Sequence, residues 1–129
     1  MFDKLEIFRM SQGLAMHAAA RQSTIAQNVA NSDTPGYRAR DLASFNDTYS
    51  SSDTSMRITR AKHAMPFDGL HKGAQAETVI RSGAMSPNGN SVSLETEIMA
   101  AAEAKRDHDL ALAVYKSSMN IMRASVGRR

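Results

Sequence analysis

The sequence predicts an all-α-dominated fold, in which long N- and C-terminal helices form an antiparallel coiled-coil arm and the loop-rich middle holds short strands. Apolar residues have helical spacing at both ends of the chain and lose it between them. Only 5% of the 129 residues are aromatic and none is Trp, which does not favour a compact globular core. We therefore expect three segments: a helix and turn over 1–37, a loop-rich middle over 38–92, and a helix over 93–129.

The N-terminal helix is predicted over residues 2–31, which contain no proline and one glycine. About thirty helical residues would extend roughly 45 Å, which suits a coiled-coil arm better than a small-domain helix. We expect Leu14 and Ile25 to pack this helix. They belong to an apolar set with spacings of three, four and seven: Ile7, Met10, Leu14, Ala18, Ile25 and Val29.

The C-terminal helix has stricter spacing, because its apolar residues alternate steps of four and three. Ser93 is the predicted N-cap, and Glu95 and Glu97 in the first turn suit the helix dipole. Only Lys105 and His108 interrupt the seam, whose members are Leu94, Ile98, Ala101, Lys105, His108, Leu112, Tyr115, Met119, Met122 and Val126. For helix packing and assembly we select Leu94, Ile98, Leu112, Tyr115, Met119 and Met122.

Further apolar residues of this helix lie outside the seam, at Leu110, Val114 and Ile121. A helix that is apolar on several sides needs several neighbours. One partner helix in the same chain would cover one face, so the surplus predicts association between subunits. The alternative is a single-chain antiparallel hairpin with a tolerably apolar surface, because scattered exposed apolar residues are normal.

The middle segment lacks helical periodicity between Tyr37 and Val92. Residues 50–55 have the small polar composition of a flexible loop. Short alternations at residues 56–59 and 77–81 are candidates for paired strands. Residues 86–90, Ser-Pro-Asn-Gly-Asn, predict a turn that leads into the C-terminal helix.

Residues 28–37, Asn-Val-Ala-Asn-Ser-Asp-Thr-Pro-Gly-Tyr, predict a helix end followed by a rigid turn. Asn31 tolerates the left-handed conformation that ends many helices, and Pro35 disfavours the helical conformation at Thr34. Pro35 and Gly36 suit the two central positions of a type II turn, in which Gly36 accepts a positive φ.

The sequence offers no constellation for catalysis or metal binding. The absence of cysteine excludes disulfides, thiolate catalysis and cysteine-type zinc sites, and leaves the compartment open. The four histidines lack the spacing of a metal-binding helix. His108, between Asp107 and Asp109, is better explained as a polar contact to a neighbouring chain than as a catalytic group. We expect no enzyme activity, no cofactor and no small-molecule substrate.

Charge and hydropathy exclude two further classes. The net charge is +3 with a pI near 9.5, but the basic residues are spread along the chain and interleaved with acidic ones, so we expect no nucleic-acid partner. Charged residues interrupt the first ten positions, which therefore lack the apolar run of a secretory signal, and no later run is long enough to span a membrane. Passage out of the cytoplasm would need another route.

The turn motif carries a family resemblance. Its residues are Asn28, Ala30, Asn31, Thr34, Pro35, Gly36 and Tyr37, and with residues 38–41, Arg-Ala-Arg-Asp, they resemble the N-terminal motif of the flagellar rod, hook and hook-associated axial proteins. Residues 86–97, followed by a long helix with Tyr115 and Lys116, resemble the proximal-rod members of that family. The short middle segment fits the same members, because distal relatives carry a large inserted domain there.

This resemblance implies a structural subunit of the proximal rod of the bacterial flagellar basal body, which assembles through its terminal helices and transmits motor torque. The implied partners are further copies of itself, other rod proteins, the adaptor FliE, and the export gate or inner-membrane ring. The implied route to the periplasmic rod is the flagellar type III apparatus, without a cleaved signal peptide. From periodicity alone, the competing function is a soluble coiled-coil binding module such as a secretion chaperone or regulator.

The aromatic pair Phe45 and Tyr49, placed after the turn, resembles a short hydrophobic element by which related export substrates contact the export gate. The alternative is that the two rings pack the turn onto the helices, because the chain has few other large side chains for that task.

Overall fold

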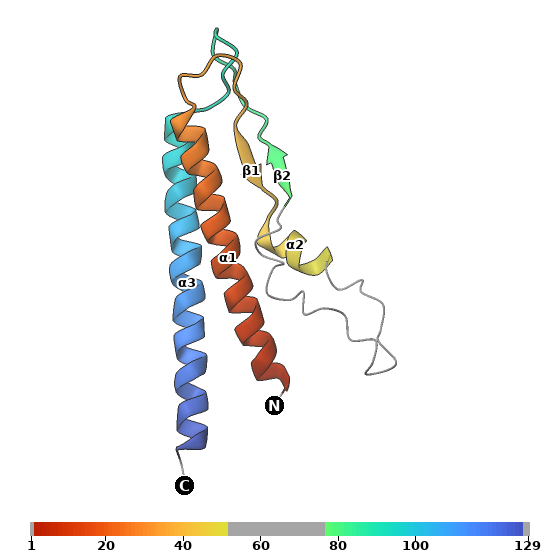
Figure 1. The fold of residues 1–129 in the computed structure, drawn as a ribbon, viewed down its shortest axis with the longest axis vertical. Coiled ribbons are helices and arrows are strands. Elements are labelled where there is room, and N and C mark those ends of the chain that lie inside the picture. The colour runs from red at the N-terminus through yellow and green to blue at the C-terminus, as the bar shows by residue number, and fades with distance from the viewer. Residues whose placement is uncertain (1, 52–76, 128–129) are drawn as a thin grey trace.

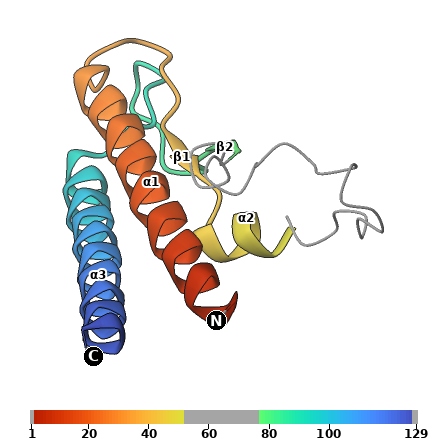
Figure 2. The ribbon, with the colours of Figure 1, turned by 60° about the horizontal axis from the view of Figure 1, so that its bottom comes forward.

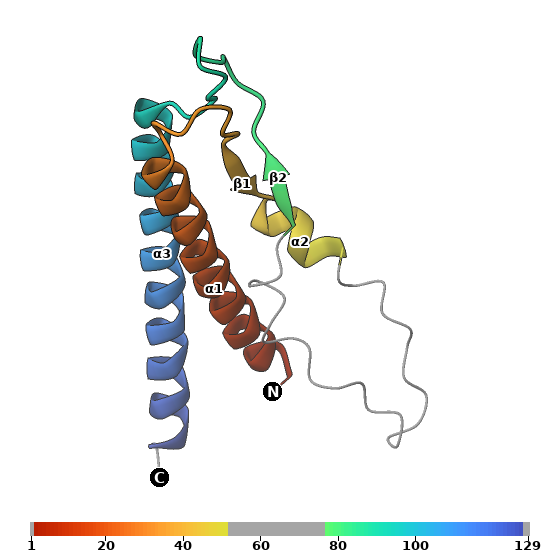
Figure 3. The same ribbon diagram turned by 45° about the horizontal axis from the view of Figure 1, so that its top comes forward.

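The computed structural model describes residues 2–51 and 77–127 and consists mainly of two long antiparallel helices (Figure 1). Helix α1 spans Phe2–Ala30 and helix α3 spans Leu94–Val126. The two lie side by side near the turn and diverge toward the N-terminus of α1, and α3 extends beyond α1 (Figures 1 and 3). The predicted fold class is confirmed. None of the helices in the described part is long and apolar enough to cross a membrane.

Helix α1 ends at Ala30 in a tightened turn. The Asn31 N–H donates to the carbonyls of both Gln27 and Asn28, at 3.1 Å each, and the Asn31 side-chain amide donates to the Gln27 carbonyl at 2.8 Å. Among the described residues no residue other than glycine has a positive φ. The left-handed conformation expected for Asn31 is therefore wrong, because the backbone and side-chain amides of Asn31 bond the Gln27 and Asn28 carbonyls without it.

Helix α3 begins after Ser93, which has the extended backbone of an N-cap (φ −109°, ψ 117°). Its carbonyl accepts from the Glu97 N–H at 3.0 Å and from the Thr96 hydroxyl at 2.8 Å. The Ser93 hydroxyl makes no capping bond. The predicted N-cap position is confirmed, although the Ser93 side chain does not bond the first amides of α3.

The contact between α1 and α3 uses small residues of α3, which lie one position before the predicted seam. Ala100, Ala104 and Ala111 are buried, and Ala100 and Ala104 form a core cluster with Ile25. Small side chains allow two helices to approach closely. The face of α3 toward α1 is defined by its buried or half-buried members Glu97, Ala100, Ala104, Ala111 and Ser118.

Three members of the predicted seam, Leu94, Ile98 and Leu112, are about half exposed or more. The prediction that they pack within the subunit is therefore wrong. Tyr115 lies at the edge of the contact, with its ring edge-on to the Phe8 ring and 5.3 Å between centroids. Met119 and Leu14 are half-buried, and Met122 lines a small hollow beside Phe8. The assembly role assigned to these residues stays a prediction.

Two short strands and a short helix lie along α1 (Figure 2). Strand β1 (Arg40–Leu42) pairs antiparallel with strand β2 (Thr78–Ile80) in the register Arg40 to Ile80, Asp41 to Val79 and Leu42 to Thr78. The alternation at 77–81 thus contains a strand, as predicted. Its partner is β1, which follows the turn and was not among the predicted strands. The other alternation, at 56–59, and most of the polar stretch 50–55 lie outside the described residues.

Helix α2 (Phe45–Ser51) occupies a place where a loop was expected. Ser44 caps it, because its hydroxyl accepts from the Asp47 N–H at 3.2 Å and contacts the Asp47 carboxylate at 2.6 Å. This pairing of the N-cap with the third helical residue resembles a capping box.

Amide hydrogen exchange on a dilute, proven monomer should reveal graded protection. We expect strong protection near Ala100 and Ala104, and weak protection toward both termini, because the last turns of α3 have few neighbours. Val126, for instance, is 78% exposed. Uniformly strong protection along both helices would contradict this prediction. Oligomeric state must be established first, because association alone would add protection.

Candidate functional site

The family-type turn packs against the loop that precedes α3. Gly36 has a φ of 74°, and the Tyr37 N–H donates to the Thr34 carbonyl at 3.3 Å, in agreement with the predicted type II turn. The Gly36 N–H donates to the Asn88 carbonyl at 3.0 Å, and a Cβ on Gly89 would lie 3.4 Å from the Gly36 Cα. We call residues 31–37 and 86–92 together the head of the hairpin.

Asn90 fixes the head. Its side chain is 1% exposed, and its amide nitrogen lies within hydrogen-bonding distance of three carbonyls: Asn31 (3.0 Å), Ser32 (2.6 Å) and Thr34 (2.9 Å). Its amide oxygen accepts from the Val92 N–H at 2.7 Å. One buried side chain therefore satisfies the backbone of both the helix exit and the turn.

Asn28 performs the corresponding task for β1. Its amide nitrogen donates to the Arg40 carbonyl at 2.7 Å, and its oxygen accepts from the Arg40 N–H at 3.0 Å, so the side chain makes the pair of bonds that a neighbouring strand would make. The same oxygen accepts from the Tyr37 hydroxyl at 3.3 Å. Two residues of the family motif are thereby joined to the first strand.

A network of alternating charges connects these elements to α3. Arg81 donates to the Glu97 carboxylate at 2.7 Å and to the Asp41 carboxylate at 2.6 Å, and Arg21 donates to Asp41 at 3.1 Å. Glu97 is fully buried and also accepts from the Asn28 amide at 3.2 Å. All buried polar side-chain atoms in the described part have hydrogen-bond partners, as buried charges require.

The network lowers the pKa of Asp41. Burial alone would raise it, but hydrogen bonds from Arg21 and Arg81 and the backbone N–H of Leu42 outweigh burial, so the pKa lies below its ordinary value. Burial by itself would lower the pKa of Arg21. The hydrogen bond to Asp41 and the attraction of that carboxylate outweigh burial, so the pKa of Arg21 is raised. Both groups are therefore charged at neutral pH.

We expect this pair to make folding stability depend on acidity. Because the pKa of Asp41 is lowered in the folded state, its contribution is fully present above the ordinary carboxyl pKa and is lost as pH falls through the folded value. Asp41→Asn should reduce the unfolding free energy by about 1–3 kcal/mol at neutral pH and flatten its decline in acid. Denaturant unfolding at several pH values measures both effects, and an unchanged acid decline would contradict the assignment.

The remaining motif residues are at the surface. Ala30, Thr34, Pro35 and Gly36 are exposed, and Asn31 and Tyr37 are half-buried. The exposed part of the turn is available to a partner, whereas Asn28 acts inside the subunit.

Phe45 packs α2 onto α1. Its ring lies 5.7 Å from the His17 ring and 5.5 Å from the Tyr49 ring, between centroids, and a Cβ on Gly13 would come within 3.5 Å of it. His17 is buried and its Nε2 lies 2.8 Å from the Ala43 carbonyl oxygen, to which it donates. Tyr49 is exposed, so the two aromatic residues have different surroundings.

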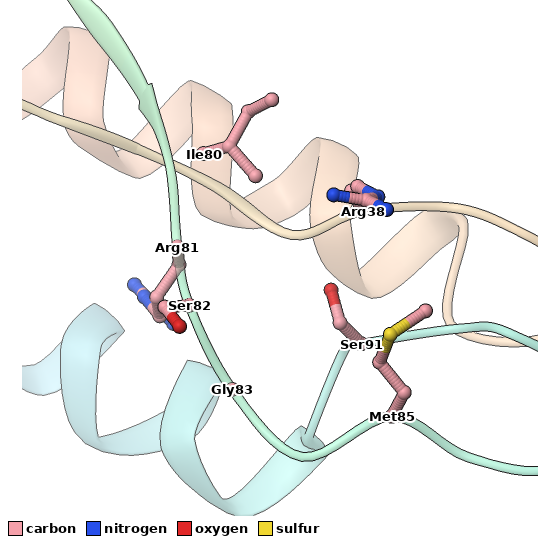
Figure 4. A pocket seen from close by; sticks show the side chains of 7 residues that line it. All are labelled: Arg38, Ile80, Arg81, Ser82, Gly83, Met85 and Ser91. Carbon is pink, nitrogen blue, oxygen red and sulfur yellow. The ribbon is translucent and has the colours of Figure 1, made fainter.

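Nothing described in the site resembles a reactive centre. Residues 2–51 and 77–127 contain no group of three His, Cys, Asp or Glu that could hold a metal ion. A hollow of about 210 Å³ lies beside β2 (Figure 4), and its lining supplies two guanidinium groups and two hydroxyls, from Arg38, Ile80, Arg81, Ser82, Gly83, Met85 and Ser91. His108, which we expected to make an intersubunit contact, lies 3.9 Å from the Asp109 carboxylate at the surface of α3.

Sequence reasoning missed Asn90, Arg81 and Glu97 as a connected site. The hydrogen bonds that join them to other elements span 16 to 69 residues of the sequence, so no local spacing could predict them. The available signal was indirect: Glu97 and Asn90 are polar residues beside the start of a long helix.

Known proteins resemble this chain over both the motif and the full length. The family described as "Flagella basal body rod protein" matches residues 9–38. The flagellar basal body rod protein FlgB of Agrobacterium fabrum is 27% identical over 127 residues, which cover 96% of this chain and 95% of that protein. The FlgB proteins of Escherichia coli and Shigella flexneri are each 49% identical over 43 residues, about a third of either chain.

Proposed function

The chain belongs to the flagellar basal body rod protein family, and from this premise we propose that it builds the proximal part of the rod. It is a structural rod subunit of the basal body and assembles with other rod components. We further propose that it assembles through its two terminal helices and transmits motor torque.

The observation that carries this proposal is the uncovered apolar surface of α3. Ile98, Met99, Leu110 and Ile121 are each more than half exposed although α1 packs along the same helix. Large apolar side chains left exposed in this way indicate a protein contact. The head and the charge network support torque transmission, because the hydrogen bonds of the head and the ion pairs of the network fix α1 and α3 to one another at one end.

The proposed partners beyond the rod are the adaptor FliE and the inner-membrane ring or export gate, with export through the flagellar type III apparatus and no cleaved signal peptide. The support for these finer points is the similarity to FlgB proteins, together with the exposed face of the turn. Membership of a structural family favours a role without enzymatic activity. A soluble coiled-coil module such as a chaperone or regulator is not favoured, because it would not explain the turn motif.

Localisation tests the proposal directly. A tagged chain expressed in a strain that lacks its own copy should restore swimming, co-purify with basal bodies, and be labelled at the membrane-proximal end of the rod. Recovery only in the cytoplasm, bound to unexported flagellar proteins, would instead support the chaperone alternative. Labelling at the distal rod would overturn the proximal placement and leave the rod assignment standing.

Phe45 and Tyr49 test the proposed contact with the export gate. If both aromatic side chains form the recognition element, Phe45→Ala and Tyr49→Ala should each lower secretion of otherwise soluble subunit several-fold, measured in culture supernatant against the cellular pool. The exposed Tyr49 serves as the matched variant, because its removal disturbs packing less. If secretion stays normal and only assembly fails, the rings are packing residues and the signal lies elsewhere.

A further inference from the structure

Helix α3 presents two exposed flanks on either side of its contact with α1. Adjacent helical residues are about 100° apart, so residues one position after a member of the contact face lie on one side of it and residues one position before lie on the other. Steps of three, four or seven residues continue each side along the helix. Both flanks carry large apolar side chains that α1 leaves exposed. They differ in charge.

The basic flank contains three positive side chains and no carboxylate. Its members are Leu94, Ile98, Lys105, Leu112, Lys116, Met119 and Arg123. Lys105, Lys116 and Arg123 are all exposed. The nearest acid is Asp109, which lies farther round on the outer face and has its carboxylate 3.9 Å from His108. An apolar row with lysine and arginine along it favours an apolar and acidic partner surface.

The acidic flank contains the opposite charge. Its members are Met99, Glu103, Asp107, Leu110, Val114 and Ile121. Arg106 lies at its outer edge, 3.6 Å from Asp107. Glu103 contacts Arg21 at 3.5 Å, but Arg21 is shared with Asp41.

Arg21 does not neutralise the acidic flank. Arg21 and Arg81 are the guanidinium groups of the charge network, and they face four carboxylates: Asp41, Glu97, Glu103 and Asp107. With Arg106, which contacts Asp107, three guanidinium groups face these four carboxylates, so one negative charge is left in excess among these groups, beside the exposed apolar residues Met99 and Leu110.

We propose that the basic flank of one copy of this chain packs against the acidic flank of the next copy. The inference rests on the proposed function, since it names the surfaces by which the rod subunit would meet itself. The contact is heterologous, because each subunit contributes a different surface to each of its two contacts. Repetition of such a contact produces a ring or an open helical array instead of a closed two-fold dimer.

Reciprocal charge reversal of the full-length protein tests this contact. Lys105→Glu makes the basic flank acidic, and Glu103→Lys makes the acidic flank basic. Each variant alone should self-associate at least tenfold more weakly than the unmodified chain in sedimentation velocity, because like charges then meet. An equimolar mixture of the two should associate again, since each reversed flank now finds its complement. Self-association of the unmodified chain should weaken with added salt.

Two further variants keep the test decisive. Glu103→Lys removes the ion pair of Glu103 with Arg21 and could disturb Arg21. Leu110→Lys adds positive charge to the acidic flank without removing an ion pair, and it should weaken association as Glu103→Lys does. Ala113→Glu adds charge to the exposed outer face and should leave association unchanged. Circular dichroism of each variant verifies that the helices remain folded.

Three results would overturn the proposal. One is unchanged association of Lys105→Glu, and another is failure of the equimolar mixture to recover. The third is association of Lys105→Glu with the unmodified chain as strong as with Glu103→Lys, which would indicate that two basic flanks meet each other, because both partners retain the basic flank. If any of these occurs while the chain still co-purifies with basal bodies, the flank contact is wrong and the rod function stands.

Discussion

Glu97→Ala is expected to lower the unfolding free energy by about 3 kcal/mol, because it removes a fully buried carboxylate and leaves the half-buried Arg81 guanidinium without one of its two carboxylates. The Glu97 carboxylate is fully buried and lies 2.7 Å from Arg81. Its loss would also leave the Asn28 amide without a partner on the α3 side. Arg81 retains Asp41, which keeps the expected cost at the lower end for a buried pair.

Denaturant unfolding of a preparation of proven oligomeric state measures this cost. Glu95→Ala is the matched control, because Glu95 is an exposed acid in the same first turn. It should cost only about 0.5 kcal/mol through the helix dipole, and Glu97→Gln should fall between the two because it retains an oxygen acceptor. Equal effects of Glu97→Ala and Glu95→Ala would show that Glu97 acts only through the dipole.

The difference between these two glutamates could not be predicted from the sequence. Both are acids in the first turn of a predicted helix, and both suit its dipole. Only the arrival of Arg81 and Asn28 from other elements separates them. Local rules did predict the turn correctly, because Pro35 and Gly36 determine its backbone without distant partners.

The sequence pattern also could not predict which face of α3 contacts α1. Periodicity predicts which residues share a face, but α3 is apolar on several sides, so more than one face could meet α1. The alanines at 100, 104 and 111 form the contact. The larger Leu112 and Ile98 lie beside it, although their size made them the better candidates by hydrophobicity.

The middle segment shows a third reason why elements of the fold could not be predicted from the sequence. Strand β1 consists of Arg40, Asp41 and Leu42 and has no strand pattern of its own. Asn28 and β2 hold it from either side. Helix α2, by contrast, has a local sequence signal, because Ser44 and Asp47 stand at the spacing of an N-terminal cap and form one.

Leu112→Asp is expected to block rod assembly and swimming while leaving export intact. In the subunit Leu112 is 49% exposed, so the substitution should do little to the hairpin. At a subunit contact, however, it would bury an unpaired carboxylate at a cost of several kcal/mol. Swimming in soft agar, secreted subunit and basal-body yield measure the three outcomes separately.

Ala113→Asp is the matched control, because it places the same side chain one residue along on the exposed outer face of α3. Both variants carry a similar helix-propensity penalty. A difference in assembly between them therefore depends on which face of α3 carries the new carboxylate. Swimming of Leu112→Asp at the normal rate would show that its flank stays exposed in the rod. Loss of assembly in Ala113→Asp alone would move the subunit contact to the outer face, where Ala113 and Ala102 leave room for a neighbouring helix.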